Sequence, residues 1–450
     1  MFHLTSFVER PRSACALSGA LSTFSALPGV IPIVHAAMGC GGNLSGANSF
    51  GAGYWGAGYC GGGSVPTSAI TETEIVFGGD ERLREEIEST IELMDGALYV
   101  VATGCMTEMI GDDTKGVAAD FAREGRPVIA VSTPSFKGDS YAGYEIALNG
   151  IFNEYLGGAA KKGKDPRLVN IFGVVPAYDP FFRGDLEEIA RLAKGLGLEA
   201  NTFFTPDQTF ENVERAPSAS LNIVFSRAWG TSFAKQFEDA HGTPYWVTDL
   251  PVGPEASDEF LFGLADRTGI SQRKARALVK RENDVYYGYF ERTADVFCDS
   301  DFKFYAVTVT NANYAIPVAR YAHRELGWVL LDSFVTDQLS EPQKDALSGA
   351  WSRTGLPSGL SYEADTSLIA RAITQRHPEN RGQRYFDSPT PLFILGSSLE
   401  KATALKRGAN QLSISFPAFN RMIVDRGYAG YRGGLHLFED IVGSLVFPKG

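Results

Sequence analysis

Residues 97–113 read ALYVVATGCMTEMIGDD and decide the expected fold. Their first part, Ala97–Thr103, is an apolar run that ends at a glycine and Cys105. A short apolar run of this kind is typical of a buried strand in a parallel sheet. Comparable runs at Ile31–His35 and Val128–Val131 predict two further strands of the same sheet.

Amphipathic stretches separate the apolar runs, and we expect them to be helices that cover the sheets. In Asp80–Leu93, the residues Leu83, Ile87 and Ile91 recur at helical spacing among Glu and Arg residues. Alternating strands and helices imply parallel sheets with right-handed crossovers. Further helices are expected at Ala16–Phe24, Gly184–Leu196, Phe233–His241 and Ala312–Leu326. Further strands are expected at Leu168–Val174, Leu221–Phe225, Asp295–Phe297, Trp328–Leu331 and Pro391–Leu395.

The chain is too long for one small core, since it has 450 residues and domains usually hold about 100 to 200. The pattern breaks in a polar, glycine-rich stretch near Lys161–Pro166 and again near Thr293. We therefore predict an α/β fold of three Rossmann-like lobes with parallel sheets. Their expected ranges are 1–165, 166–293 and 294–450.

The stretch Gly41–Gly63 has an unusual composition. It contains ten glycines interleaved with Phe50, Tyr54, Trp55 and Tyr59. A flexible linker is one interpretation, but linkers rarely carry so many aromatic side chains. We expect a packed loop beside a site or an interface.

The composition excludes several classes of protein. Hydrophobic residues make up 44% of the chain and charged residues 21%, which is typical of a soluble globular protein. The net charge is −12 and no block of Lys and Arg is present, so we expect no nucleic-acid binding. The apolar stretch Gly19–Met38 is interrupted by Pro28 and Pro32, so we expect no membrane span. The amino terminus lacks the order of a signal peptide, and we expect a cytoplasmic protein.

Three of the five cysteines indicate a metal centre. An odd number of cysteines in a long chain without a secretion signal argues against a disulfide framework. Cys40 and Cys105 each follow a predicted strand, and Ser135 follows the third, so all three would lie at one rim of the sheet. Cys15 directly precedes the first predicted helix. Thiolates that are distant in sequence but close in space are what an iron–sulfur cluster requires.

Glycines beside these cysteines support the same interpretation. Gly39 and Gly104 would let the backbone approach a bulky inorganic group, and N–H groups in turns and at helix starts favour anionic sulfur. Zinc is the competing metal, but no two cysteines are separated by two residues as in common zinc sites. We interpret Cys298 as a packed structural residue. For Cys60 we favour the same interpretation, with an extra thiol near the metal as the alternative. The six histidines are scattered, and none is assigned to the metal.

Ordered motifs along nearly the whole chain carry a resemblance to a known family. In the first lobe they are Pro32–His35 with Gly39–Cys40, Val76–Gly79, Thr103–Asp113 and Thr133–Phe136. In the other lobes they are Thr243–Tyr245, Leu250–Gly253, Asp258–Leu261, Gly396–Ser398, Ser415–Arg421 and Gly430–Gly434. A single motif carries little weight, but the ordered set resembles component 1 of nitrogenases and nitrogenase-like reductases.

The resemblance implies the β-type subunit of such an enzyme. In that subunit three cysteines, matched here by Cys15, Cys40 and Cys105, hold half of a P-cluster. This [8Fe-7S] group bridges to the α-type subunit. Ser135 matches a serine that can ligate the oxidised cluster in some members. The catalytic iron–sulfur cofactor of the family is held by a Cys and a His of the α-type partner, and the matching stretch here, Ser226–Gly230, has no cysteine.

The resemblance also implies the partners. The chain would form an α2β2 heterotetramer with the α-type subunit. It would relay electrons from an ATP-dependent iron protein to the cofactor in that partner. Phe77, Glu108, Asp112 and Asp113 fall near the surface on which the iron protein docks.

Departures from the common nitrogenase pattern leave the substrate open. In nitrogenases the segment matching Gly41–Gly63 is usually rich in aromatic, Arg and His residues, unlike the glycine-rich stretch here. We therefore favour a methylthio-alkane reductase, which cleaves C–S bonds. The alternatives are a β subunit of a true nitrogenase and a cofactor-assembly scaffold subunit. A tetrapyrrole reductase subunit with one [4Fe-4S] cluster and an α/β binding protein with incidental cysteines are two more.

Overall fold

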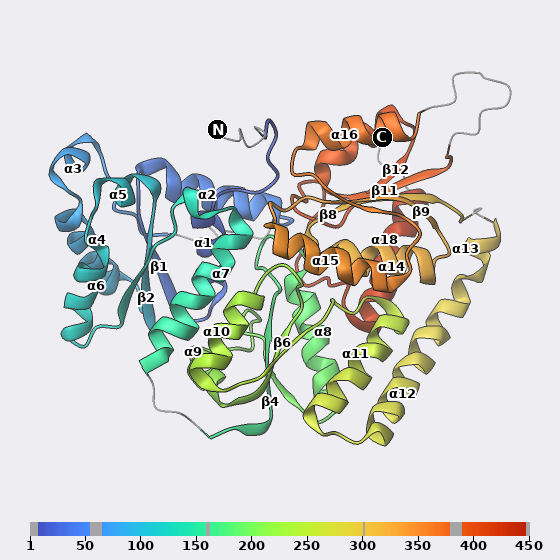
Figure 1. Ribbon diagram of the computed structural model, residues 1–450, viewed down its shortest axis with the longest axis horizontal. Coiled ribbons are helices and arrows are strands. Elements are labelled where there is room, and N and C mark those ends of the chain that lie inside the picture. Colours follow the sequence, from blue (N-terminus) through green and yellow to red (C-terminus); the bar gives the residue numbers. More distant parts are fainter. Residues whose placement is uncertain (1–7, 55–64, 159–162, 300–301, 379–388, 447–450) are drawn as a thin grey trace.

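Three parallel sheets organise the chain (Figure 1). The computed structural model describes residues 8–54, 65–158, 163–299, 302–378 and 389–446. The first sheet has the order β1-β2-β3, with β1 at Val30–His35, β2 at Leu98–Thr103 and β3 at Val128–Val131. All pairings between its strands are parallel, which confirms the expected α/β class.

The second and third sheets are also parallel throughout. The second has the order β5-β4-β6-β7, with β4 (Asp165–Phe172), β5 (Glu199–Asn201), β6 (Ala219–Val224) and β7 (Tyr245–Val247). The third has the order β10-β9-β8-β11-β12, with β8 (Tyr305–Thr310), β9 (Val329–Val335), β10 (Leu360–Tyr362), β11 (Leu392–Gly396) and β12 (Asn410–Ser413).

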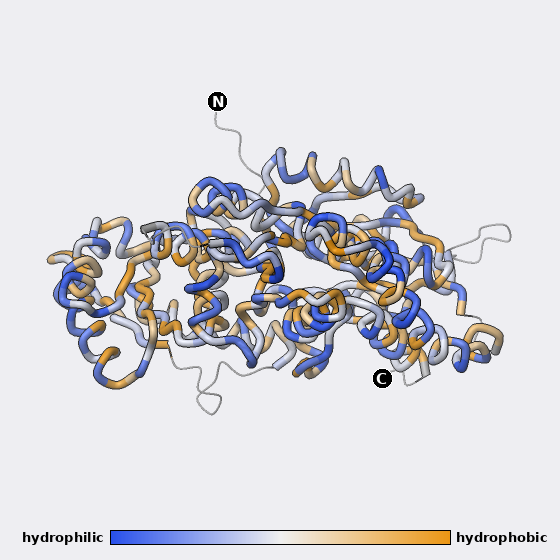
Figure 2. Tube along the Cα trace, turned by 90° about the horizontal axis from the view of Figure 1, so that it is seen from below, coloured by the Kyte–Doolittle hydropathy of each residue, from blue (hydrophilic) through white to orange (hydrophobic). Residues whose placement is uncertain are grey.

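Helices cover these sheets, and along the outer ones polar and apolar residues alternate in the trace (Figure 2). Those around the first sheet are α1 (Ala16–Ala26), α2 (Met38–Gly51), α3 (Glu72–Phe77), α4 (Asp80–Leu93), α5 (Cys105–Ile110), α6 (Thr114–Arg123) and α7 (Ser140–Leu148). Next along the chain come α8 (Phe182–Gly195), α9 (Phe210–Arg215), α10 (Thr231–His241), α11 (Gly253–Thr268), α12 (Gln272–Phe290) and α13 (Ala294–Asp299). The last are α14 (Ala312–Arg320), α15 (Glu341–Thr354), α16 (Thr366–Arg376), α17 (Lys401–Lys406) and α18 (Gly430–Val446). Each helix among the described residues is too short or too polar to span a bilayer.

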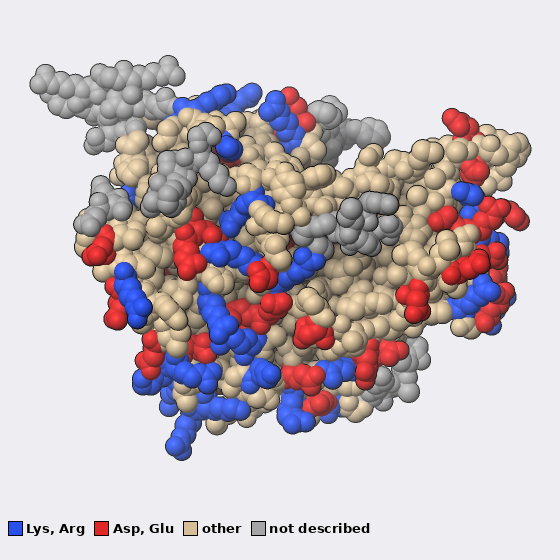
Figure 3. All heavy atoms as spheres, turned by 180° about the vertical axis from the view of Figure 1, so that it is seen from behind, with Lys and Arg blue, Asp and Glu red and all other residues tan. Residues whose placement is uncertain are grey.

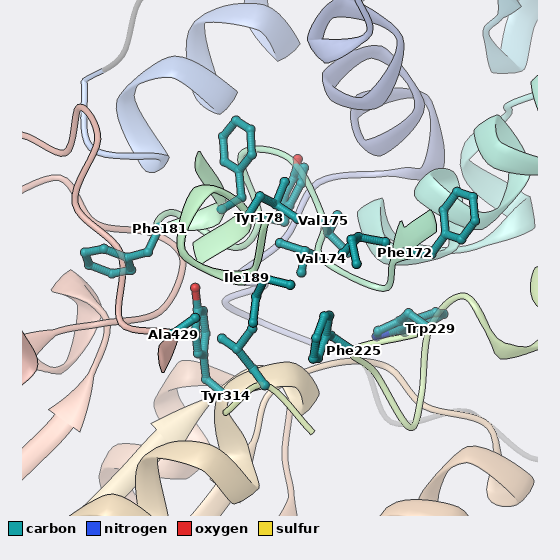
Figure 4. Packing of buried hydrophobic residues seen from close by; sticks show 14 of the residues in the cluster. Phe172, Val174, Val175, Tyr178, Phe181, Ile189, Phe225, Trp229, Tyr314 and Ala429 are labelled. Carbon is teal, nitrogen blue, oxygen red and sulfur yellow. The ribbon is translucent and has the colours of Figure 1, made fainter. Parts of the chain in front are cut away.

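One large core joins the three lobes. Its buried side chains include Phe172 from β4, Tyr178, Trp229 and Tyr314 from α14 (Figure 4). The chain also returns across the lobes, because α18 packs against α8 and α11. Burial of each large apolar side chain contributes roughly 1.5–3 kcal/mol, so this shared core fixes the lobes against one another. The boundaries given above for the lobes stay a prediction.

Part of the glycine-rich stretch is a helix, where the sequence indicated a loop. Glycine inside a helix costs about 1 kcal/mol relative to alanine, so contacts with neighbouring elements must stabilise α2. Asn48 supplies such contacts from a buried position: its Nδ2 donates to the Ser18 carbonyl at 3.1 Å, and its Oδ1 accepts from the Tyr178 hydroxyl at 2.8 Å. Cys60 lies outside the described residues.

The strand expected at Asp295–Phe297 is wrong, because these residues belong to helix α13. A three-residue segment with two apolar side chains is too short to distinguish a strand from a helix, and Phe297 packs here against other aromatic rings. The lobe's first strand is instead β8, a run of β-branched residues that the sequence patterns did not single out. Cys298 therefore lies exposed on a short helix and not at the start of a strand.

Candidate metal centre

The strands of the first sheet end together at one rim. β1 and β2 remain paired up to their last residues, His35 and Thr103, and β3 runs parallel beside β2. New elements begin just beyond this rim. Cys40 lies in the first turn of α2, Cys105 is the first residue of α5, and Ser135 begins a single 3-10 turn. The parallel topology thus brings residues from three distant segments to the same edge.

Cys105 and Ser135 are in direct contact. The Cys105 thiol donates to the Ser135 Oγ atom at 2.9 Å, and the Ser135 backbone N–H donates to the Cys105 Sγ atom at 3.2 Å. The cysteine is half-buried and the serine is exposed. A sulfur and an oxygen ligand for one metal centre would need this proximity, although their role as ligands stays a prediction.

Cys15 is held to the same region by the segment that follows Ser135. It is the N-cap residue of α1 and forms an isolated antiparallel bridge with Asp139. The backbone N–H of Ala16 donates to the Gly138 carbonyl at 2.9 Å. The start of α1 is therefore attached to the turn that carries Ser135.

Cys15 and Cys105 act electrostatically on Cys40. Burial raises the pKa of the Cys40 thiol, and negative charge on Cys15 and Cys105 raises it further. The N-terminal end of a helix favours anionic sulfur, whereas burial and the like charges disfavour it at Cys40. Three thiolates at one place repel each other, so they need a cationic centre to remain deprotonated together.

The donor set fits an iron–sulfur cluster better than a single ion. Within the described ranges, no group of three or more His, Cys, Asp and Glu side chains is placed to hold one metal ion. A multi-iron cluster is larger, and its thiolate ligands can therefore stand farther apart. Cys15, Cys40 and Cys105 are free thiols and only half-buried, which is compatible with a group shared with another chain.

The two glycines singled out from the sequence differ in their surroundings. A Cβ atom on Gly104 would lie 2.5 Å from the Cβ atom of Ala36, so packing within the chain already requires glycine there. At Gly39 the nearest atom to such a Cβ is the Asn43 side-chain nitrogen at 3.4 Å. Contact with a cluster stays a prediction for both, and Gly104 has an explanation without one.

Apolar side chains are exposed close to this rim, where docking was expected. Phe77, at the end of α3, is 83% exposed and its neighbour Val76 is 71% exposed. Met109 on α5, a helix that contacts α3, is 75% exposed. Surface apolar groups gathered in this way mark interaction sites. We call Val76, Phe77 and Met109 the α3–α5 surface.

Of the acidic residues predicted for docking, Asp112 does not lie on the surface. Its side chain is 3% exposed and faces His35, with 2.9 Å between Asp112 Oδ2 and His35 Nε2. Glu108 is half-buried and accepts a hydrogen bond from the Thr103 hydroxyl. Only Asp113 is exposed, and it caps α6. Sequence reasoning missed His35, although a polar residue that ends an apolar strand is a visible signal.

Aromatic side chains fill the junction between the lobes. In the segment Ser226–Gly230, the ring of Trp229 stacks on Tyr141 with 5.7 Å between centroids. Its Nε1 donates to the Asp337 carboxylate of the third lobe at 2.7 Å. Figure 4 shows Trp229 and Phe225 among the buried side chains of this core. The stretch matched to a cofactor site in the α-type subunit thus contributes packing here.

Comparison with known proteins agrees with these observations. A family model described as nitrogenase component 1 type oxidoreductase matches residues 15–446. The nitrogenase molybdenum–iron protein β chain of Bradyrhizobium diazoefficiens is 26% identical over 468 residues, covering 97% of this chain and 83% of that protein. A solved structure of nitrogenase Cp1 at pH 6.5 has a TM-score of 0.76 at 19% identity and covers 99% of this chain and 95% of that chain. That likeness shows the fold.

Two further relatives match over shorter lengths. The nitrogenase molybdenum–iron protein α chain of Clostridium pasteurianum is 33% identical over 196 residues, which cover 43% of this chain and 35% of that protein. The nitrogenase iron–molybdenum cofactor biosynthesis protein NifE of Nostoc sp. is 26% identical over 267 residues, which cover 59% of this chain and 53% of that protein. The β-chain relative therefore aligns over the greater share of the chain.

Proposed function

Because this chain belongs to the nitrogenase component 1 type oxidoreductase family, we propose that it holds half of a bridging P-cluster. Its similarity to β chains extends over nearly its whole length, and it is a β-type oxidoreductase subunit of a hetero-oligomer. The observation that carries the proposal is the arrangement of Cys15, Cys40 and Cys105. Three half-buried thiols from separate segments stand at the rim of one sheet, and two of them act electrostatically on the third, Cys40.

The residues of this chain would act on the cluster in distinct ways. Cys15, Cys40 and Cys105 would hold it as thiolates, and Ser135, which is in contact with Cys105, would supply an oxygen ligand. Burial and backbone N–H groups adjust the reduction potential of such centres. When bound, the P-cluster supplies reversible electron storage.

Two surfaces of the chain fit the proposed partners. The α3–α5 surface is the proposed docking site for an ATP-dependent iron protein. Seen from behind, a band with few charged side chains runs from the middle of the molecule towards the end of the first lobe (Figure 3). An uncharged face of this kind suits a permanent partner, here the α-type subunit in an α2β2 assembly. The catalytic cofactor would lie in that partner, since aromatic side chains fill the junction in this chain.

We favour cleavage of C–S bonds, as in methylthio-alkane reductases, as the reaction of the complex. The glycine-rich stretch Gly41–Gly63, which directly follows Cys40, supports this choice because it departs from the nitrogenase pattern. Reduction of dinitrogen is the alternative that the names of the β-chain relatives favour. A cofactor-assembly scaffold is another alternative, and the similarity to a cofactor biosynthesis protein favours it.

The test is to purify the complex with its α-type partner under anaerobic conditions and count iron. About eight irons per heterodimer in the shared cluster support the P-cluster, and about four indicate a [4Fe-4S] cluster. The Cys40→Ala variant should lose the visible absorption of the cluster and all substrate reduction. Cys298→Ala is the matched control, because Cys298 is exposed on α13 and should be replaceable without effect.

Activity assays then separate the candidate functions. Wild-type complex, iron protein and ATP should cleave the C–S bond of a methylthio-alkane. Turnover of dinitrogen alone would indicate a true nitrogenase. A complex that contains a transferable cluster but turns over neither substrate would indicate a scaffold. Retention of both activity and absorption in Cys40→Ala would overturn the proposed cluster site.

A further inference from the structure

His35 is a fully buried polar residue at the end of an apolar strand. Its Nε2 lies 2.9 Å from Asp112 Oδ2 and its Nδ1 lies 2.9 Å from Ser68 Oγ. Burial lowers the pKa of the imidazole more than Asp112 raises it, so the ring is neutral near pH 7. A neutral ring donates from one nitrogen and accepts at the other, which matches a carboxylate on one side and a hydroxyl on the other.

Asp112 connects this ring to the segment that follows Phe77. Its Oδ1 accepts a hydrogen bond from the backbone N–H of Gly79 at 2.8 Å. A Cβ atom on Gly79 would lie 2.6 Å from Asp112 Oδ2 and 3.1 Å from His35 Cε1, so the backbone there rests directly on the pair. Gly78, which lies between Phe77 and Gly79, has φ +92°, a conformation that glycine adopts without strain. The end of α3 is thus a glycine turn packed on the His35–Asp112 pair.

The main chain of His35 supports the start of α5. Its carbonyl oxygen accepts from the Gly104 N–H at 2.9 Å and from the Thr107 hydroxyl at 2.9 Å. Cys105 lies between these two donors. Five residues after His35 the chain reaches Cys40. The side chain of His35 therefore contacts the segment behind the α3–α5 surface. Its backbone connects to the segments that carry Cys40 and Cys105.

We propose that His35 is a positioning residue that couples docking on the α3–α5 surface to the placement of Cys40 and Cys105. This inference rests on the proposed function, because docking of the iron protein there is part of it. A protein that binds Phe77 displaces the turn at Gly78 and Gly79. The rigid Asp112–His35 pair transmits that displacement to the rim. An apolar side chain at position 35 would fill the same space without joining these segments.

The first experiment measures the link itself by hydrogen–deuterium exchange in the purified complex. Asp112→Ala removes the acceptors of both His35 and Gly79. It should raise exchange in peptides covering residues 75–82 and, at the same time, in those covering 36–42 and 104–108. Tyr99→Phe is the matched control. Its buried hydroxyl also makes two hydrogen bonds, to Met94 and Gly96, at the opposite end of the same sheet. Faster exchange confined to residues 75–82 would overturn the proposal.

The second experiment measures electron delivery while the iron protein is titrated. In Asp112→Ala the maximal rate should fall roughly tenfold, which is within the range of coupling effects seen for residues between two sites. The iron-protein concentration at half-maximal rate should stay within about twofold, because the α3–α5 surface is intact. Iron content, visible spectrum and reduction by a low-potential dye should match the wild type. A maximal rate equal to that of Tyr99→Phe would overturn the proposal.

A conservative variant separates positioning from folding. Asp112→Asn keeps an oxygen acceptor for Gly79, so it should recover most of the maximal rate and lower the exchange again. If the Asp112→Ala complex does not assemble, Asp112→Asn is compared with Ser68→Ala, which loses only the Nδ1 contact of His35. Their exchange and maximal rates then decide whether His35 links the two segments. Wild-type complex that accepts no electrons from any iron protein refutes the proposed function. The exchange data still decide whether the segments are linked.

Discussion

The Sγ atom of Cys105 lies 2.9 Å from the Oγ atom of Ser135, although 30 residues separate them in the chain. This contact exists because β2 and β3 are adjacent parallel strands whose carboxyl ends reach the same rim. It places a weakly acidic hydroxyl beside a thiol that is predicted to bind iron. The same relationship allows the serine to be tested independently of the cysteines.

Removal of the Ser135 hydroxyl should change the oxidised cluster and leave its assembly intact. In Ser135→Ala, iron content should equal that of the wild type, because the three thiols remain. The electron paramagnetic resonance spectrum of the oxidised complex should differ, while the reduced complex should look unchanged. An oxidised spectrum identical to the wild type would show that Ser135 is not a ligand.

A methyl group added between α1 and α7 should destabilise the chain and loosen Cys15. A Cβ atom on Gly19 would lie only 1.7 Å from the Ser140 carbonyl oxygen, so the two helices must move apart. Overpacking of this kind typically costs about 1–3 kcal/mol. Gly19→Ala should therefore lower Tm and iron retention, measured by thermal unfolding and iron analysis.

Gly288→Ala is the control for that variant. Gly288 lies in helix α12, and among the described residues no atom beyond its own helical turn lies within 4 Å of the position that an alanine methyl group would take there. Alanine should therefore be neutral or stabilise the helix by up to about 1 kcal/mol. If both variants unfold at the same temperature, contact between α1 and α7 is looser than the structure shows.

The buried ion pair between Arg12 and Glu400 should contribute strongly to stability. The guanidinium donates to Glu400 and to the Ser397 hydroxyl, and both charged side chains are almost fully buried. Removing one partner of a buried pair costs about 3–5 kcal/mol, because the other charge is left without compensation. Arg12→Ala should lower the free energy of unfolding by that amount, measured by denaturant titration.

An exposed pair provides the comparison. Lys280 and Asp284 form an i,i+4 pair on α12 with both side chains largely in solvent. Such pairs contribute about 0.3–0.5 kcal/mol, so Lys280→Ala should have little effect. Equal losses in Arg12→Ala and Lys280→Ala would contradict the assignment of a buried pair.

Stability should decrease as the pH rises from about 4 to about 7. Burial raises the pKa of Asp185 to about 7 and that of Asp179 to about 6, well above the ordinary value of an aspartate. A carboxyl whose pKa is higher in the folded chain stabilises it at low pH, and this contribution is lost as the pH rises through the folded pKa. Thermal unfolding should show Tm falling as the pH rises from about 4 to about 7 and levelling off above that.

Asp185→Asn should flatten that pH dependence. Asparagine keeps an oxygen that can accept from the backbone N–H groups of Tyr428 and Ala429, and it does not ionise. Asp345→Asn, at an exposed position on α15, should retain the wild-type profile. If Tm changes with pH equally steeply in the two variants, Asp185 does not titrate in this range.

Local patterns in the sequence were sufficient for much of the first lobe. The helix predicted at Asp80–Leu93 has the same bounds in the structure, because its apolar residues recur at helical spacing and bury one face. The strand β3 also has its predicted bounds. Such elements are determined by residues close together in the sequence, and they set which cysteines follow which strand.

Other features depend on partners that are distant in the sequence. The helix α2 forms in a glycine-rich stretch because Asn48 bonds to α1 and to Tyr178, 130 residues away. Asp112 is buried and not exposed because its partner His35 lies 77 residues earlier. Neither contact leaves a periodic pattern in the sequence.

The sequence by itself determined the parallel α/β fold and the order of the residues predicted to bind the cluster, because strand and helix periodicity are local properties. Only the tertiary structure decided that Cys105 touches Ser135, that Asp112 supports His35 and that Trp229 fills the lobe junction. Those contacts depend on where the connections between strands place each segment in space. Hydrogen bonds and packing between distant segments then set the burial and the protonation state of each side chain.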